Sequence, residues 1–107
     1  MLGRMTETLV QVDGRLESGA VPAFQGRLTA ASPLGTEKVL LDLSRVSFIG
    51  SAALRAILMA AKQLGTSGGR LAIFAPPHIA EMFAFSGLDA VLTVRLSLAQ
   101  AQESLAE

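Results

Sequence analysis

The amino-acid sequence predicts a single α/β domain with a mostly parallel sheet of four to five strands and about four helices. Short apolar runs of strand type alternate along the chain with segments whose apolar residues recur every three to four positions. The connections between them are short, so right-handed crossovers between parallel strands are expected. With 107 residues, the chain has the size of one domain, expected over residues 1–107 with residues 1–5 as a ragged leader.

Composition and charge narrow the classes of function. Half of the residues are hydrophobic and 17% are charged, which supports a folded core and argues against intrinsic disorder. Nine Lys and Arg balance nine Asp and Glu, so no net charge attracts nucleic acid or an anionic membrane. The cations are scattered, and the chain has neither Tyr nor Trp to stack on bases. Nucleic acid is therefore not expected as a partner.

The absence of cysteine bears on compartment and chemistry. It excludes disulfides, thiolate metal sites and a cysteine nucleophile, and it fits a reducing compartment. The N-terminal residues lack the continuous apolar segment of a secretory signal. No apolar run approaches the roughly 20 residues that span a bilayer. We therefore expect a cytoplasmic protein that is not embedded in a membrane.

The first third of the chain predicts a strand and a helix. Strand formers at residues 9–12 favour a short strand, which the turn-forming pair Asp13 and Gly14 is expected to end. Residues 20–31 follow with Ser18 as a candidate N-cap. The apolar side chains of this helix lie three and four positions apart, on one face: Val21, Phe24, Leu28 and Ala31.

The middle of the chain predicts the best-defined strand and the longest helix. Residues 39–43 have the near-continuous apolar pattern of a central strand that is buried on both faces. A helix is expected to begin at Ser51 and to end at Gly65. Its buried stripe is expected to consist of Leu54, Ile57, Leu58, Ala61 and Leu64.

A further strand and helix are predicted after this helix. Residues 70–74 form another buried strand, and Pro76 and Pro77 then turn the chain into a helix that Gly87 ends. Its buried side chains are expected to be Ile79, Met82 and Phe83. Phe85 is out of phase with them and is expected to be exposed, which makes it a candidate contact for a partner.

The last predicted elements are a strand over residues 91–94 and an amphipathic helix over residues 97–105, with Ser97 as its N-cap. Since the strands are expected to run parallel, their carboxyl ends meet at one edge of the sheet. Open α/β sheets bind their ligands and partners at this edge.

The loop of residues 47–54 joins the strongest strand to the strongest helix and is therefore the first candidate site. A helix N-terminus exposes unpaired N–H groups and a partial positive charge, which stabilise an anion or a phosphorylated side chain. Ser51 stands at this position. Its simplest interpretation is the helix N-cap, a role that stabilises by about 1 kcal/mol.

A hydrolase nucleophile elbow is the catalytic alternative for Ser51, and it fits poorly. That motif requires Gly-x-Ser-x-Gly, and Ala53 stands where the second glycine belongs. His78 is the only histidine and is better explained as a surface or first-turn residue than as a triad member. With Glu81 as its only nearby carboxylate, His78 is not expected to hold a metal. We expect no enzymatic activity, no metal and no cofactor.

Three short segments together resemble the STAS domain, the family of bacterial anti-sigma factor antagonists and of the cytoplasmic tails of sulfate transporters. The resemblance covers nearly the whole chain, and the segments stand in the family's order. They are Gly14-Arg15-Leu16-Glu17, similar to Gly-x-Leu-Asp; Asp42-Leu43-Ser44 with Val46 and Phe48, similar to Asp-Leu-Ser/Thr-x-Val-x-Phe; and Phe83 to Leu88, similar to Phe-x-x-Ser/Thr-Gly-Leu.

The resemblance also implies a phosphorylation switch in the candidate loop. The family's loop typically runs Asp-Ser-Ser/Thr-Gly-Leu, and a partner kinase phosphorylates its second hydroxyl residue. Here Ala52 stands at the acceptor position, Gly50 replaces the acidic residue and Ala53 replaces the glycine, whereas Ser51 and Leu54 keep the pattern. Ser51 is the candidate substitute acceptor, since added negative charge there would block a partner.

The resemblance implies a protein-binding module for transcription regulation. The first hypothesis is an anti-sigma factor antagonist that docks on an anti-sigma factor or a related serine kinase. The partner-binding residues are expected to be Phe48, Gly50, Ser51, Ala52, Ala53, Arg55 and Phe85, with exposed small residues that admit a partner backbone. The alternative is an accessory subunit that binds the ATPase of an ABC-type lipid transporter, and a serine hydrolase comes third. Formation of a homodimer is left open by the apolar composition.

Overall fold

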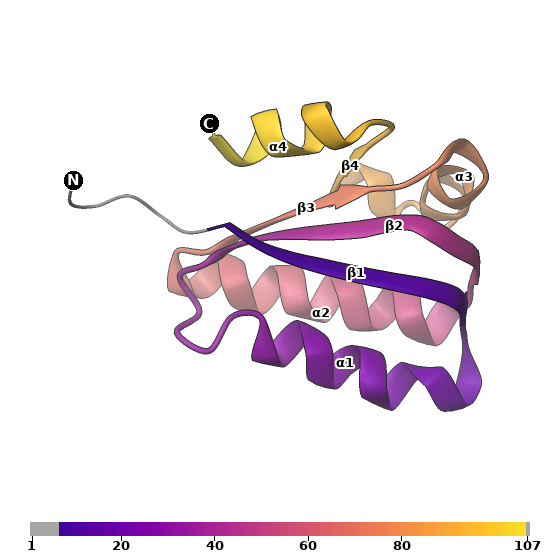
Figure 1. Cartoon of the computed structure of the whole chain (residues 1–107), viewed down its shortest axis with the longest axis horizontal. Coiled ribbons are helices and arrows are strands. Elements are labelled where there is room, and N and C mark those ends of the chain that lie inside the picture. The colour runs from indigo at the N-terminus through magenta and orange to yellow at the C-terminus, as the bar shows by residue number, and fades with distance from the viewer. Residues whose placement is uncertain (1–6, 107) are drawn as a thin grey trace.

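The computed structural model describes residues 7–106 and has four parallel strands in the order β1-β2-β3-β4 (Figure 1). The expected leader at residues 1–5 lies outside the described residues. The strands are β1 Glu7–Leu16, β2 Lys38–Ile49, β3 Arg70–Phe74 and β4 Thr93–Arg95. The helices are α1 Val21–Ala30, α2 Ser51–Ser67, α3 Pro77–Phe85 and α4 Leu98–Ala106, with short 3-10 turns η1 Ser18–Ala20 and η2 Leu88–Ala90. The predicted fold class is confirmed.

Helices cover both faces of the sheet. Helices α1 and α2 lie on one face and α4 on the other, while α3 stands at the edge where β1 and β2 end (Figure 1). Alternation along β2 explains this arrangement, because successive side chains of a strand point to opposite faces. Leu41 and Leu43 belong to the large core with α1, α2 and α3, whereas Leu40 packs with Ala101 and Leu105 of α4.

Strand β1 is longer than predicted, because Asp13 and Gly14 do not end it. The parallel register with β2 shifts between Gln11 and Asp13 and again between Gly14 and Arg15. Gly14 has φ +78, a conformation that glycine adopts without a steric penalty. The turn-forming pair therefore makes irregularities within the strand.

Strand β2 and helix α2 also extend beyond their predicted ends. Strand β2 continues to Ile49 because β1 pairs with it along that extension. Helix α2 passes through Gly65 and ends with Gly68 as its C-cap, in the left-handed region at φ 93. Gly65 has open space around it, so nothing there interrupts the helix. The predicted stop at Gly65 is wrong by three residues.

Of the three serines predicted as helix N-caps, the structure confirms one. Ser97 is confirmed, because its Oγ accepts a hydrogen bond of 3.1 Å from the backbone N–H of Gln100. Ser18 is not a cap: it lies in η1 with φ 49, and the N-cap of α1 is Ala20. Ser51 is the first residue of α2, whose N-cap is Gly50. The last strand also differs from residues 91–94, beginning at Thr93 after an exposed Val91.

Candidate functional site

The candidate site lies at the sheet edge where β1 and β2 end side by side, as predicted for parallel strands. Leu16 and Ile49 are register partners at these ends. The backbone N–H of Gly50 donates to the Leu16 carbonyl oxygen at 2.9 Å, and the Gly50 carbonyl accepts from the N–H of Leu54 at 3.0 Å. These two hydrogen bonds tie the loop before α2 to the end of β1.

Gly50 permits a close approach between this loop and the turn after β1. A Cβ atom at position 50 would lie 3.3 Å from Cβ of Glu17 and 3.6 Å from the Leu16 carbonyl oxygen. The backbone of Gly50 is extended, with φ −90 and ψ 171, so proximity and not conformation favours glycine here. The backbone and Cβ of Glu17 thus lie against Gly50, the position where the resemblance expects an acidic residue, while the Glu17 carboxylate pairs with Arg15.

The first turn of α2 divides into exposed and buried residues. Ser51, Ala52 and Arg55 are exposed, whereas Ala53 is fully buried and Leu54 nearly so. The expectation that Ala53 is exposed is therefore wrong. Its methyl group packs in the large core, because helical periodicity turns residue 53 toward the sheet when residues 51, 52 and 55 face solvent. Ala53 supports the surface from beneath.

Arg15 and Glu17 add charge beside Phe48, and the sequence pattern alone did not assign them to the site. The Arg15 guanidinium carbon lies 4.6 Å from the centre of the Phe48 ring, a cation–π distance. Arg15 Nε also donates to Glu17 Oε2 at 2.5 Å. Arg15 and Phe48 are register partners in the parallel β1–β2 pair, so the register is the signal that brings them together.

Phe85 is 87% exposed at the end of α3, as predicted, while Phe83 is buried in the core. Helix α3 is tied to the same edge of the sheet by His78, whose Nε2 lies 3.2 Å from the Val46 carbonyl oxygen. His78 donates to that oxygen in the tautomer that carries its proton on Nε2. Phe85 therefore belongs to the element next to the candidate loop rather than to the loop itself.

Asp42 is a buried carboxylate in the middle of β2. Its Oδ1 accepts from the backbone N–H of Ser44 at 2.9 Å, and its Oδ2 accepts from Gln11 Nε2 at 3.1 Å. Burial acts to raise the pKa of Asp42, but the hydrogen bonds from Ser44 and Gln11, together with nearby Arg45, outweigh it and lower the pKa. Asp42 thus holds β1 and β2 together as an ionised side chain.

The described residues around Ser51 were expected to hold neither a catalytic triad nor a metal site, and their hydrogen bonds and carboxylates can be compared with that expectation. Among residues 7–106, the Ser51 hydroxyl makes no hydrogen bond to His78 or to another potential base. No cluster of His, Asp and Glu within that range is placed to hold a metal ion. None of the helices formed by these residues combines the length and apolar character that a membrane crossing needs.

Comparison with known proteins identifies similar sequences and folds. A family model described as "Mlab, STAS domain" matches residues 4–96. The chain is 33% identical over 99 residues to a Bordetella bronchiseptica protein named as the anti-sigma factor antagonist BtrV, covering 84% of this chain and 85% of that protein.

Two solved structures have a similar fold. An anti-sigma factor antagonist from Mycobacterium paratuberculosis has a TM-score of 0.85 at 23% identity, over 94% of this chain and 86% of that one. The Bacillus protein SpoIIAA in its unphosphorylated form has a TM-score of 0.74 at 22% identity, over 99% of this chain and 92% of that one.

Proposed function

The chain belongs to the STAS domain family, and on this premise we propose that it is an anti-sigma factor antagonist. It acts in the cytoplasm as a binding module without catalytic activity, and its partner is an anti-sigma factor or a related serine kinase. The observation that carries the proposal is the 33% identity to a relative named for this role, over 84% of this chain.

The proposed docking surface is the edge where β2 passes into α2. Ser51 and Ala52 are small and exposed, so they allow a partner backbone to approach the start of the helix. Arg55 and Phe85 are exposed side chains that anchor the rim, and half-buried Phe48 is held in place by Arg15. Arginine and aromatic anchors around small residues are typical of protein interfaces.

Ser51 is the proposed acceptor if this chain is regulated by phosphorylation. Its hydroxyl is exposed on the first residue of α2 and makes no side-chain hydrogen bond to other residues of the described range. A phosphate there lies near the positive end of the helix dipole. The added charge would change the docking surface while the fold remains intact. Intact-mass analysis after incubation with the native partner kinase tests this step, and an unmodified mass rejects it.

A second candidate is the accessory subunit of an ABC-type lipid transporter, bound to its ATPase. Two observations favour it: the matching family model is described by the name Mlab, and Ala52 lacks the hydroxyl that a reversible switch needs. In this case binding is permanent and Ser51 remains unmodified.

Gentle purification of the tagged protein from its native host, followed by mass spectrometry, separates the two candidates. An anti-sigma factor or serine kinase as main partner supports the antagonist, and phosphate on Ser51 supports the switch. An ABC ATPase with unmodified Ser51 supports the transporter subunit. The same purification from a strain that carries the Ala52→Glu and Arg55→Glu substitutions is the matched control, since a partner that docks on this surface should be lost.

A further inference from the structure

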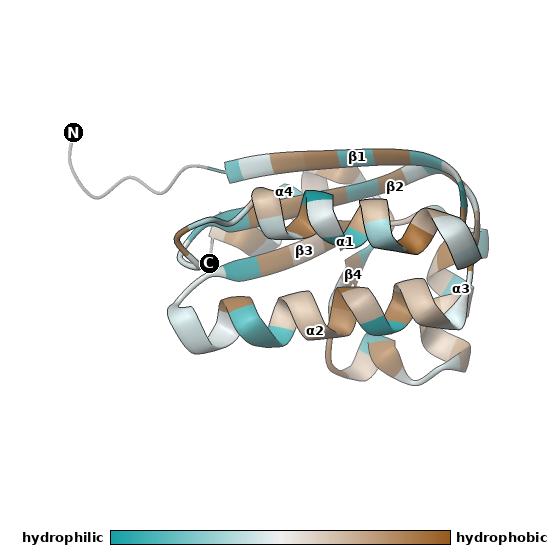
Figure 2. Cartoon of the chain, turned by 90° about the horizontal axis from the view of Figure 1, so that it is seen from below, coloured by the Kyte–Doolittle hydropathy of each residue, from teal (hydrophilic) through white to brown (hydrophobic). Residues whose placement is uncertain are grey.

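A long groove between α1 and α2 opens into the proposed docking surface. The two helices run side by side, and both begin at the edge where β1 and β2 end (Figures 1 and 2). Two hollows of about 480 and 390 Å³ lie along them and share Leu28, Thr29, Ala60 and Gln63. The first hollow includes Ala52 and Arg55, so the groove is continuous with the start of α2.

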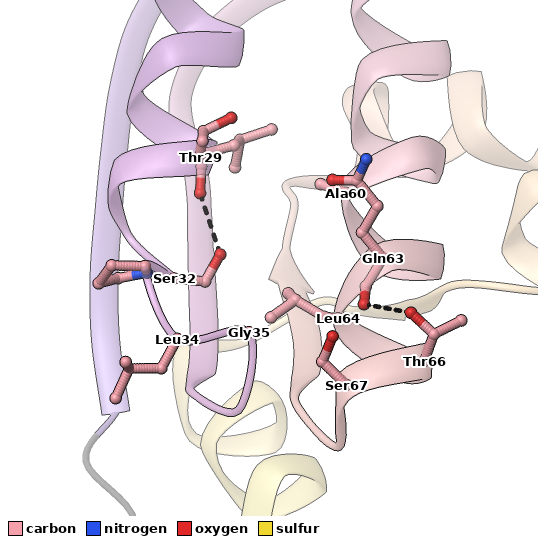
Figure 3. Close-up of a pocket in the computed structure, with 11 residues that line it drawn as sticks. Thr29, Ser32, Leu34, Gly35, Ala60, Gln63, Leu64, Thr66 and Ser67 are labelled. Atoms are coloured by element: carbon pink, nitrogen blue, oxygen red, sulfur yellow. Dashed lines mark hydrogen bonds between the residues drawn. The ribbon is translucent and has the colours of Figure 1, made fainter.

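The floor and the far end of the groove have different chemistry. Leu28, Ala56 and Ala60 provide an apolar floor, and the small alanines leave room for a close helix approach. At the far end, Thr29, Ser32 and Gln63 line the hollow together with Thr66 and Ser67 (Figure 3). An occupant therefore meets an apolar strip with polar margins, as an amphipathic helix requires.

The two helices that border the groove carry charge of one sign. Neither α1 nor α2 contains an acidic residue, although the whole chain is neutral. On α2, Arg55, Met59 and Lys62 are exposed and spaced at i, i+4 and i+7, which aligns them along one stripe. Within residues 7–106, neither Arg55 nor Lys62 forms an ion pair. Arg55 and Met59 line the hollow at the start of α2, and Lys62 stands one turn further along the same stripe, outside the residues that line either hollow.

We propose that this groove receives an amphipathic helix of the partner protein, with its apolar face on Met59 and the alanine floor, one acidic residue opposite Arg55 in the groove and another reaching Lys62 beside it. This inference rests on the proposed function, because it assigns the partner element that engages the same surface. Complementary charge selects an acidic helix over a basic one. A partner helix that lies in the groove packs on α1 and α2, with its axis at the usual distance of about 8–10 Å from theirs.

Site-specific photo-crosslinking in the native host tests the location and the occupant together. A benzophenone amino acid replaces Ala52 in one strain, Met59 in a second and Val91, an exposed residue between η2 and β4 that lines neither hollow, in a third. We expect positions 52 and 59 to capture the same protein and position 91 not to. The peptide crosslinked at position 59 should be an amphipathic segment rich in Asp and Glu.

The crosslinks distinguish failure of this inference from failure of the proposed function. Capture of an anti-sigma factor or serine kinase at position 52 but not at position 59 overturns the helix-in-groove proposal and leaves the antagonist role standing. A basic or non-helical segment at position 59 overturns it as well, and so does lipid attached there. No capture of a regulatory protein at either position rejects both proposals.

Charge reversal supplies the energetic test on the purified complex. The double variant Arg55→Glu and Lys62→Glu should weaken binding of the captured partner by about tenfold or more, since two attractive contacts become repulsive. Arg95→Glu, an exposed cation on β4, is the matched control and should change affinity less than about twofold. Equal losses in both variants would falsify the groove as the site of charge recognition.

Discussion

Position 52 decides whether the docking surface carries a conventional phosphoacceptor. Ala52 is exposed on the second residue of α2, one residue after exposed Ser51. A serine at position 52 adds one hydroxyl to this surface without a new buried polar group. Both residues lie in the first turn of α2, but their side chains point about 100° apart around the helix axis, so a kinase meets the two positions from different directions.

We predict that Ala52→Ser creates an acceptor that the partner kinase modifies faster than Ser51. Phosphopeptide mass spectrometry over a time course measures both rates. Ser51→Ala in the Ala52→Ser background is the control, and it should retain most of the incorporated phosphate. Incorporation that remains on Ser51 in the Ala52→Ser protein would contradict the assignment of position 52 as the family's acceptor position.

Asp42 makes the stability of the fold depend on pH. Its folded-state pKa is lowered, so its contribution to the free energy of unfolding is present above the unfolded pKa of about 3.9 and is lost as pH falls through the lower folded pKa. We predict that Asp42→Asn lowers the free energy of unfolding at pH 7 by about 1–3 kcal/mol, because hydrogen bonds to a charged group are removed.

Urea unfolding from pH 7 down to pH 2 checks this prediction. The wild-type protein should lose stability on the acid side that the Asp42→Asn variant has already lost, so the two curves converge at low pH. Asp89→Asn, at an exposed position, is the control and should run parallel to the wild type. A constant gap between wild type and Asp42→Asn at every pH would show that Asp42 acts through its shape and not its charge.

At the scale of elements, two glycines of the α2–β3 region have opposite roles. A Cβ at Gly69 would lie 2.7 Å from the carbonyl oxygens of Glu37 and Gly35 and from Cδ2 of Leu64, because the turn before β2 packs directly on the turn before β3. Gly65 lies within α2 and has nothing within 4 Å. The first position needs glycine for space, and the second carries only its helix-propensity cost.

We predict that Gly69→Ala lowers the free energy of unfolding by about 1–3 kcal/mol through overpacking, while Gly65→Ala raises it by about 0.5–1 kcal/mol. Thermal and urea unfolding of the two variants measure the difference directly. Since both changes add the same methyl group a few residues apart, a shared sign would refute the packing argument.

The same elements show which features of the secondary structure can be predicted from the sequence pattern. Hydrophobic patterning predicted the four α-helices and four strands of the described residues in order, because burial of one face dominates local structure, but it predicted neither 3-10 turn. The pattern failed where tertiary contacts override local preference: β1 continues past Asp13 and Gly14 because β2 pairs with it there, and Gly65 does not end α2. Element boundaries depend on such neighbours, which the sequence pattern does not contain.

The candidate site was predictable in place and only partly in detail. The loop at the carboxyl end of β2 follows from the parallel topology, and exposed Phe85 follows from its helical phase. The burial of Ala53 follows from the same periodicity once α2 begins at Ser51. It was missed because Ala53 was grouped with the small residues of an exposed loop. The Arg15, Glu17 and Phe48 cluster required the β1–β2 register, which no motif in the chain encodes.

At the scale of the whole molecule, the two faces of the sheet are unequally covered. The face toward α1, α2 and α3 carries the large core, whereas, among residues 7–106, the opposite face has Leu40, Ala72, Ala101 and Leu105 as its buried apolar residues, with Phe74 packed against them. Free energies of local opening follow the amount of buried apolar contact. Helix α4 is therefore expected to open before the helices on the other face.

We predict that Leu105→Ala releases α4 selectively, with a loss of about 2–4 kcal/mol in the free energy of opening of that helix. Leu105 is 1% exposed, and its truncation leaves a cavity in the small cluster that it forms with Leu40, Ala72 and Ala101. Hydrogen exchange measured by mass spectrometry should show faster exchange in α4 and β4 and unchanged protection in β2 and α2. Leu98→Ala, in the same helix but 39% exposed, should have little effect.

If protection instead fell equally over the whole chain in Leu105→Ala, the two sides of the sheet would form a single cooperative unit. A partner bound on the α1–α2 side would then stabilise α4 as well, and the docking surface would be coupled to the opposite face.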